Sequence, residues 1–213
     1  MLTVPGVYAP QHDTHLLLRA VSRERIGLGT RVLELGTGSG ALAVHTARLG
    51  ARVTAVDISR RAVLCARVNA AFHGSRVTVR RRDLSSPGGA GYDLVVSNPP
   101  YVPAPADLPP LSGSARAWDG GWDGRAVVDR VCATAASALR TGGVLLMVHS
   151  AMCGIDATIE VLARSGLDAG VVDRELVLLG PVLRSRLPWL RAQGLVAEGQ
   201  DKEEPVVIRA QRR

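Results

Sequence analysis

Short apolar runs of strand length alternate with segments of helical period, and this alternation limits the fold more than any other feature of the chain. It predicts a parallel sheet covered by helices on both faces. We therefore expect an α/β fold: a Rossmann-like, mostly parallel sheet of about seven strands forming a single domain over residues 1–213. The expected strands are 31–35, 52–56, 76–80, 92–97, 143–149, 167–179 and 205–209; the expected helices are 13–25, 41–49, 60–72, 123–139 and 155–165, while 181–193 fits neither class clearly.

Composition narrows the setting of the protein. With 213 residues, 46% of them hydrophobic, the chain can bury one sizeable core. No apolar run approaches the ~20 residues of a membrane span, and the N-terminus does not resemble a signal peptide, so we expect a cytoplasmic protein without a membrane partner. Cys65, Cys132 and Cys153 are odd in number and share no metal-type spacing, which predicts reduced thiols and no bound metal.

The net charge of +7 comes almost entirely from arginine, because Lys202 is the sole lysine. Such a charge attracts nucleic acids and acidic protein surfaces. Apart from residues 80–82 the arginines are scattered, and no aromatic residues interleave with them. We therefore favour compositional bias as the cause, and nucleic acid is the less favoured partner.

A glycine-rich loop, Glu34-Leu35-Gly36-Thr37-Gly38-Ser39-Gly40, lies where the first strand turns into a helix. Gly36 and Gly38 permit a sharp turn and a close approach of a ligand to the backbone, and Gly40 would let the helix pack closely on the strand. Asp57, at the end of the second strand, can accept both ribose hydroxyls of an adenosine cofactor. Asp83-Leu84, after the third strand, can meet the adenine amino group and ring face.

The loop alone does not choose the cofactor, because Gly36-x-Gly38-x-x-Ala41 also satisfies the loose pattern of dinucleotide-binding loops. Glu34 favours a different ligand. A carboxylate just before the glycines would repel a pyrophosphate, but it suits the cationic methionine end of S-adenosylmethionine (SAM).

The motif that closes the fourth strand, Asn98-Pro99-Pro100-Tyr101, indicates the chemistry. Two prolines stiffen the backbone and remove two N–H donors. The Asn98 side-chain oxygen and the Pro99 carbonyl can then hold an NH2 group and orient its lone pair. Tyr101 offers a ring face for a planar group. These four residues are the predicted catalytic residues of an enzyme that methylates a planar, amide-like or amino nitrogen.

Two segments are expected to flank this site. A proline-rich stretch follows Asn98, and such long irregular segments are usually functional, so residues 98–125 are predicted to form a substrate-side loop. Residues 1–25 are predicted to form an N-terminal lid and helix, with Asp13-Thr14 as the helix cap.

The motif resembles that of SAM-dependent methyltransferases with Asn-Pro-Pro-Tyr, specifically the HemK/PrmC-like protein-glutamine N5-methyltransferases in their short archaeal and eukaryotic branch. Two further stretches carry the resemblance: residues 7–17, Val-Tyr-Ala-Pro-Gln-His-Asp-Thr-His-Leu-Leu, and residues 117–125, Ala-Trp-Asp-Gly-Gly-Trp-Asp-Gly-Arg. The likeness covers roughly residues 4–150. Departures are His12, where the family often has an acid, and Trp122, in a variable position.

The resemblance implies SAM as cofactor and the glutamine of the Gly-Gly-Gln motif in a peptide-chain release factor as methyl acceptor. It implies that Gly120-Gly121 flanks the substrate entrance. The eukaryotic members need a small zinc-binding partner, which makes a small activator subunit a candidate partner here. The residues implied to surround the cofactor are Thr14, Glu34, Gly36, Asp57, Asp83, Leu84 and Asn98.

Alternatives stay open. The acceptor could instead be an exocyclic amino group of RNA or DNA, or the nitrogen of a small molecule, or the chain could bind SAM or NAD without catalysis. Some polar residues are better explained by structure: we expect a helix start rather than metal binding at His12 and His15, and a core or rim position for His149. Residues 201–204 are expected to form a solvated turn, and Trp118 and Trp122 could equally clamp a peptide or staple the loop.

Overall fold

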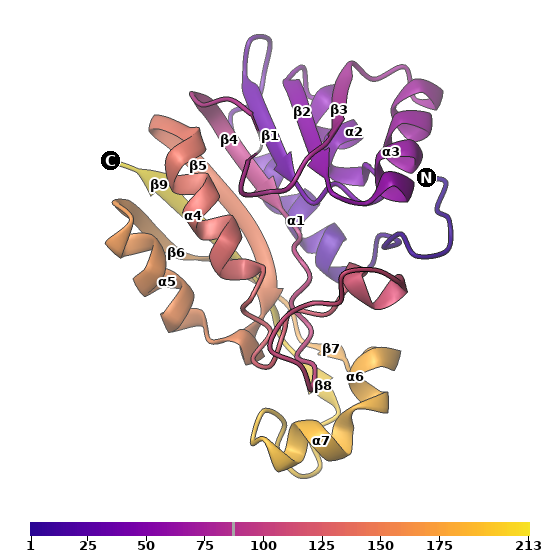
Figure 1. Cartoon of the computed structure of the whole chain (residues 1–213). Helices are drawn as coiled ribbons and strands as arrows, with labels where there is room; N and C mark the ends of the chain where they lie inside the picture. The colour runs from indigo at the N-terminus through magenta and orange to yellow at the C-terminus, as the bar shows by residue number, and fades with distance from the viewer. Residues whose placement is uncertain (87) are drawn as a thin grey trace.

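A computed structural model describes residues 1–86 and 88–213. Its main sheet has seven strands in the order β3-β2-β1-β4-β5-β9-β6 (Figure 1). Strands β1 to β5 pair in parallel, and β9 runs antiparallel between β5 and β6. The predicted fold class is confirmed. The strands of this sheet are β1 (Arg31–Leu35), β2 (Arg52–Asp57), β3 (Val77–Arg81), β4 (Tyr92–Ser97), β5 (Leu139–Ser150), β6 (Leu167–Arg174) and β9 (Pro205–Arg212).

Helices cover both faces of the sheet. They pack on the sheet through two large apolar clusters. One cluster includes residues of the first three helices, and the other includes residues of α4 and α5. None of the helices in the described part of the chain is long and apolar enough to cross a membrane. The five helices that flank the sheet are α1 (His12–Arg23), α2 (Ala41–Arg48), α3 (Arg60–Phe72), α4 (Val128–Ala138) and α5 (Ile155–Arg164).

The predicted segments 60–72 and 92–97 match α3 and β4 at both ends, whereas two other expectations need correction. The expected helix 123–139 begins only at Val128, because the residues before it make loop contacts such as the Ala126 N–H to Gly120 carbonyl bond of 2.8 Å. The expected strand 167–179 is broken after Arg174, and its last part pairs elsewhere.

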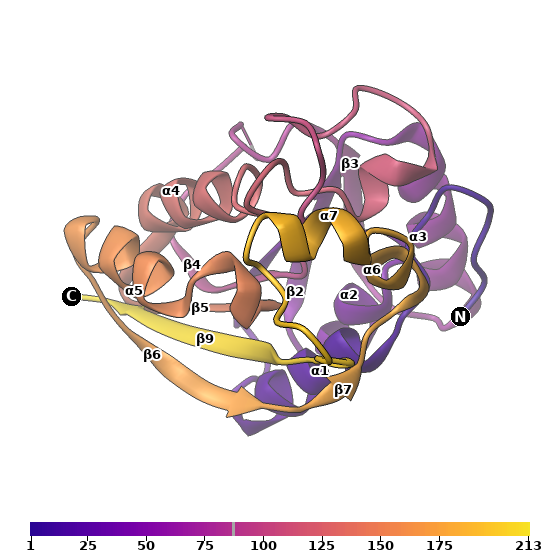
Figure 2. The same ribbon diagram turned by 90° about the horizontal axis from the view of Figure 1, so that it is seen from below.

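An insert between β6 and β9 forms a small unit beyond the end of the sheet, at the bottom of Figure 1; Figure 2 shows its two helices from below. The hairpin β7 (Val177–Leu178) and β8 (Lys202–Glu203) encloses two short helices, α6 (Pro181–Ser185) and α7 (Leu187–Ala192). Its apolar cluster, which includes Leu183 and Leu190, packs against Val102 of the substrate-side loop. The segment 181–193, whose class the sequence left open, is therefore helical and braces that loop.

Candidate active site

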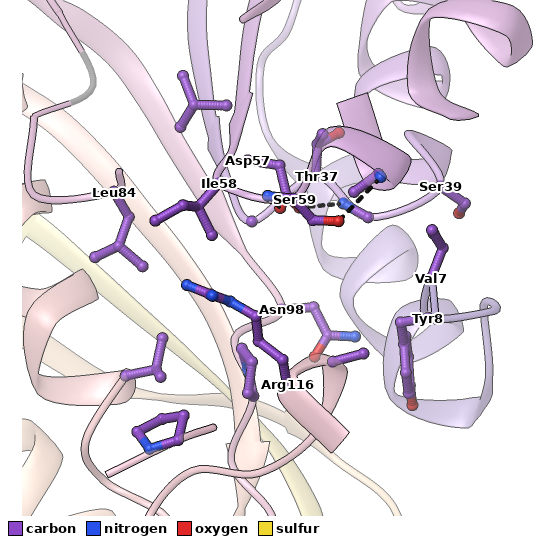
Figure 3. A pocket seen from close by; sticks show the side chains of 18 of the residues that line it. Val7, Tyr8, Thr37, Ser39, Asp57, Ile58, Ser59, Leu84, Asn98 and Arg116 are labelled. Atoms are coloured by element: carbon purple, nitrogen blue, oxygen red, sulfur yellow. Dashed lines mark hydrogen bonds between the residues drawn. The ribbon is translucent and has the colours of Figure 1, made fainter. Parts of the chain in front are cut away.

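A cavity of about 400 Å³ lies at the carboxyl ends of β1, β2 and β4 (Figure 3). In parallel α/β sheets this edge is where ligands bind. Residues 6–8 and Pro10, which precede α1, line it on one side, and residues 108–117 line it on another. Of the predicted site residues, those that line this cavity are Thr14, Glu34, Gly36, Gly38, Asp57, Asp83, Leu84, Asn98 and Pro100.

The glycine loop leaves β1 in a conformation that side chains rarely adopt. Gly38 has φ +54° and donates its N–H to Asp57 Oδ2 at 3.0 Å, which ties the loop to the end of β2. Gly40, at φ +83°, has another purpose. A Cβ there would meet the Cα and Cβ of Ala66 at 3.0 Å. Gly40 therefore allows α3 to approach, rather than the strand as expected.

Asp57 is fixed by the backbone around it. Its Oδ2 accepts from Gly38 and its Oδ1 accepts the Ser59 N–H at 2.8 Å, as the dashed lines in Figure 3 show. Burial raises the pKa of its carboxyl above the usual value, although these hydrogen bonds oppose the shift. Each oxygen has a second lone pair, so a carboxylate held in this way can still accept two ligand hydroxyls.

Glu34 is almost fully buried, at 2% exposure, yet it lines the cavity. The Thr37 hydroxyl donates to its Oε2 at 2.7 Å. Burial raises the pKa of the Glu34 carboxyl to about 8, and the nearby Asp57 adds to the shift. A buried acid of this kind ionises readily only when a cation arrives beside it. The residue thus fits a positively charged ligand group.

Asp83 lies at the rim of the cavity and is already engaged. Its Oδ1 accepts from the Ser85 N–H at 2.9 Å and from the Arg130 guanidinium on α4. Burial raises the pKa of Asp83, but these bonds and the Arg130 charge outweigh it and lower the pKa overall. Any contact of Asp83 with an adenine amino group therefore has to share the carboxylate with Arg130.

Asn98 follows β4 and is held from behind. Its Nδ2 donates to Asp13 Oδ2 at 3.1 Å and to Thr14 Oγ1 at 3.2 Å. Because a carboxylate can only accept, this contact fixes which end of the amide faces α1. The Asn98 side-chain oxygen is consequently free of α1 and available as an acceptor for a ligand.

Asp13 is the main residue whose role the sequence prediction missed. It was expected to cap the helix, but α1 begins at His12 after Gln11, so Asp13 lies inside the first turn. At 4% exposure its Oδ2 accepts from Tyr8 Oη at 2.9 Å and Tyr101 Oη at 3.0 Å, besides Asn98. One buried carboxylate therefore joins the N-terminal segment to the catalytic motif.

Pro99 and Tyr101 of the motif are buried, whereas Pro100 is partly exposed and lines the cavity. Tyr101 is 8% exposed and belongs to the apolar core, and neither it nor Pro99 is among the residues that line the cavity. Burial, then the neighbouring Asp13, raises the pKa of Tyr101 well above its usual value, so the hydroxyl stays protonated and donates. Tyr101 supports Asp13 through its hydroxyl instead of offering a ring face to a ligand.

A second acid, Glu203, lies near Asp13. The solvated turn expected at 201–204 is in part strand β8, and the Glu203 side chain is half-buried. Burial raises its pKa to about 7, a hydrogen bond with Ser150 opposes this, and the Asp13 charge adds to it. Within the described part of the chain, Glu203 Oε2 has no hydrogen-bond partner. No local sequence pattern reveals this position, because the insert alone brings β8 to the site.

The glycines of the substrate-side loop are close-packing positions. A Cβ on Gly124 would clash with the Tyr101 carbonyl, and one on Gly121 would lie 2.7 Å from the Asp107 carbonyl. Gly120 and Gly121 are buried and are not among the residues that line the cavity. Their contacts shape the loop, and the expectation that they flank a substrate entrance stays a prediction.

The insert braces the same loop. Arg186 contacts Asp119 at 2.7 Å and donates to the Pro103 carbonyl at 2.9 Å. Trp122 packs edge-to-face on Trp189 of α7, with ring centroids 5.4 Å apart. For Trp122 this contact supports the stapling interpretation, and a part in clamping a peptide stays a prediction. Arg116, which no motif indicated, also lines the cavity, and its charge acts to lower the pKa of Asp57 (Figure 3).

The histidines stay outside the site. His12 and His15 are exposed, whereas His149 is fully buried, as the expected core position requires, and its pKa is lowered by burial. Among the described residues, no group of three or more His, Cys, Asp or Glu side chains is placed to hold a metal ion.

Comparisons with known proteins identify a family and several relatives. The family model "Methyltransferase small domain" matches residues 1–107. A protein of Methanocaldococcus jannaschii named for N5-glutamine methyltransferase activity is 32% identical, over 80% of this chain and 85% of its own. Release factor glutamine methyltransferases of Geobacter sulfurreducens and Mycolicibacterium smegmatis are 36% and 40% identical over 78% and 68% of this chain. The chain spans only 60% and 54% of the length of these two bacterial relatives.

Among solved structures, the Mtq2–Trm112 complex of E. cuniculi, described as responsible for methylation of the translation termination factor eRF1, has a similar fold. The TM-score is 0.67 at 24% identity, with 98% of this chain and 99% of that chain covered. This structure shows that the fold is shared. The family match and the archaeal relative show that the chain belongs to the SAM-dependent methyltransferases of the small methyltransferase domain family.

Proposed function

We propose that this enzyme transfers the methyl group of SAM to the side-chain amide nitrogen of a glutamine in a peptide-chain release factor. The observation that carries the proposal is the Asn98 amide, which Asp13 and Thr14 hold by its nitrogen. The oxygen that remains can accept an N–H from the substrate amide. The names of the archaeal and bacterial relatives support glutamine as the acceptor.

In this proposal the glycine loop and the acids after β1, β2 and β3 bind the cofactor. Asp57 would accept its ribose hydroxyls, Leu84 would pack on its adenine, and Glu34 would lie beside its cationic amino acid end. The cavity fits such a ligand because it places a buried acid that lacks a cation near a carboxylate with spare lone pairs. Bound SAM supplies an electrophilic methyl group on sulfur.

The catalytic motif activates the acceptor by orientation. An amide nitrogen is a poor nucleophile because its lone pair is delocalised into the carbonyl. The Asn98 oxygen and the Pro99 carbonyl accept its two N–H groups, which directs the lone pair towards the methyl group. Transfer to a nitrogen held in this way would leave the sulfur of SAM as a neutral thioether. The alkylated nitrogen would be acidic enough to give its proton to water, so no strong base is required.

The flanking segments complete this assignment. Residues 1–25 act as the lid, because residues 6–8 and Pro10 line the cavity and Tyr8 is bonded to Asp13. Residues 98–125 act as the substrate-side wall, braced by the insert at Asp119 and Trp122. Both segments belong to the same single domain, residues 1–213, as the sheet.

The proposal extends to a small activator subunit of the kind present in the E. cuniculi complex. Leu64, Val68 and Phe72 are exposed at 65%, 43% and 84%, and their spacing of four places them on one face of α3. The helix itself packs against β3, the edge strand of the sheet. Co-expression with small zinc-binding proteins of the same genome should raise the melting temperature. Phe72→Asp should remove that gain, and an equal gain in this variant would contradict the docking site.

The substrate assignment is tested with purified enzyme and methyl-labelled SAM. A release factor should be labelled, and Gln→Ala in its Gly-Gly-Gln motif should abolish the label. Ribosomal RNA, DNA and a low-mass metabolite extract serve as parallel acceptors. Label that survives the Gln→Ala change, or that enters one of these acceptors instead, would contradict the proposed substrate.

A further inference from the structure

The net positive charge of the chain is concentrated in one part of the fold. Residues 25–82 contain eleven arginines against only Glu34 and Asp57, a net charge of +9, while the whole chain carries +7. The other residues together are therefore slightly acidic. The range 25–82 includes β1, α2, β2, α3 and β3. These elements lie together on the side of the sheet that has β3 as its edge strand (Figure 1).

The arginines of this region also differ in their pairing. Within the described residues, none of these eleven contacts a carboxylate at ion-pair distance, whereas ten of the fourteen arginines elsewhere do. The two acids in the range line the cofactor cavity and leave the outer surface unbalanced. Compositional bias alone would not separate paired from unpaired arginines in this way.

Part of this region is a groove of about 990 Å³ along the amino ends of β1, β2 and β3. The groove is lined by Arg31, Arg48, Arg52, Arg76 and His73, and the four arginines are exposed. Arg48 lies 3.1 Å from His73 Nδ1, and the Arg31 guanidinium is fixed over the Tyr92 ring at 5.2 Å. The groove thus presents several guanidinium groups, some of them held in place by neighbours.

The groove and the cofactor cavity lie at opposite ends of the same strands. The cavity is bordered by the residues that follow β1 and β2, and the groove by those that begin them. A molecule in the groove would therefore leave the cavity and Asn98 accessible. This separation argues for a docking role and against a second substrate position.

We propose that this groove binds the phosphate backbone of double-helical RNA. Guanidinium groups pair with phosphates in a forked geometry. When an arginine without a carboxylate partner neutralises a phosphate, it releases a counterion that was condensed on the nucleic acid, and this favours binding. The range 25–82 contains one aromatic residue, Phe72, so it lacks the series of rings on which single-stranded bases stack. The choice of RNA over DNA rests on the proposed function, because a release factor works on the ribosome.

The test measures binding of the full chain to a labelled RNA duplex of about 20 base pairs by fluorescence anisotropy, at several salt concentrations. The test variant carries Arg48→Gln, Arg52→Gln and Arg76→Gln. The matched control carries Arg164→Gln, Arg184→Gln and Arg213→Gln, which removes the same charge from exposed positions outside the region. We expect the test variant to bind at least tenfold more weakly and the control to change less than twofold. The slope of log K against log salt concentration should decrease in the test variant by the equivalent of about two to three phosphate contacts.

Three results would overturn the proposal: equal losses in both variants, tighter binding of duplex DNA than RNA, or tighter binding of an acidic polypeptide such as polyglutamate. The melting temperature and labelling of an isolated release factor should be unchanged in the test variant. RNA binding is measured without methyl transfer. If the groove does not bind RNA, only the anisotropy result changes, whereas an incorrect substrate assignment shows only in the labelling of the release factor.

Discussion

The two ends of the cavity hold their acids in different ways. At the cofactor end, Glu34 and Asp57 line the cavity and are bonded to the glycine loop, which follows Glu34 directly and contacts Asp57 across 19 residues of chain. At the acceptor end, Asp13 does not line the cavity but is bonded to Asn98, and its contacts come from residues as distant as Tyr101. Glu203 lies near Asp13. One end is built to meet a ligand directly, and the other orients the side chain that meets it.

This division predicts that variants at the two ends separate binding from turnover. Asn98→Ala should reduce kcat about 100-fold or more, because it removes an oriented acceptor at the reacting nitrogen. The dissociation constant of SAM, measured by calorimetry, should change only a few-fold. A large loss of SAM affinity in this variant would mean that the two ends are not separable.

Asp57→Ala should show the reverse pattern. Losing the two hydroxyl contacts of a charged acceptor should weaken SAM binding about 10- to 100-fold. At saturating SAM, kcat should stay within a few-fold of the original enzyme. Circular dichroism serves as the control, since equal losses of binding and turnover would instead indicate misfolding of the loop tied to Gly38.

SAM affinity should depend on pH through Glu34. The free protein holds this acid protonated up to a pKa of about 8, and a bound cation favours its ionised form and lowers that pKa. Affinity should therefore rise by up to about tenfold per pH unit as the pH approaches 8, then level off. Glu34→Gln should flatten the profile measured by titration calorimetry; a profile unchanged by this substitution would assign the proton to another group.

Tyr101→Phe should have the smallest effect. It keeps the ring but removes the 3.0 Å hydrogen bond to Asp13, which should cost about 1–3 kcal/mol of unfolding free energy. We expect kcat to fall about threefold, since Tyr8 and Asn98 still hold Asp13. Denaturant unfolding and steady-state kinetics measure the two effects. A loss as large as that of Asn98→Ala would restore a direct role for Tyr101.

Much of the cofactor end could be predicted from the sequence because its contacts are local. Gly36, Gly38 and Asp57 belong to one strand-turn-helix-strand unit, and the pattern of their spacing reflects that unit directly. The alternation of segments likewise predicted a sheet of seven strands, with α3 and β4 at their observed ends.

The acceptor end depended on long-range contacts that no local pattern encodes. Asp13 has the sequence features of a helix cap, and only the folded chain brings Tyr101, 88 residues away, to its carboxylate. Glu203 reaches the site because it lies on β8, which returns from the insert and pairs with β7. The charge pattern was likewise visible in the sequence, but the segregation of unpaired arginines required the ion pairs of the folded protein.

The central claim is that the methyl group goes to a glutamine amide nitrogen beside Asn98. The most direct measurement is fragmentation mass spectrometry of release factors from cells with and without this gene. In cells with the gene we expect one methyl group on the glutamine of the Gly-Gly-Gln peptide. This methyl group should be absent in the deletion strain and in a strain carrying Asn98→Ala. A methylated glutamine that persists in both strains would contradict it.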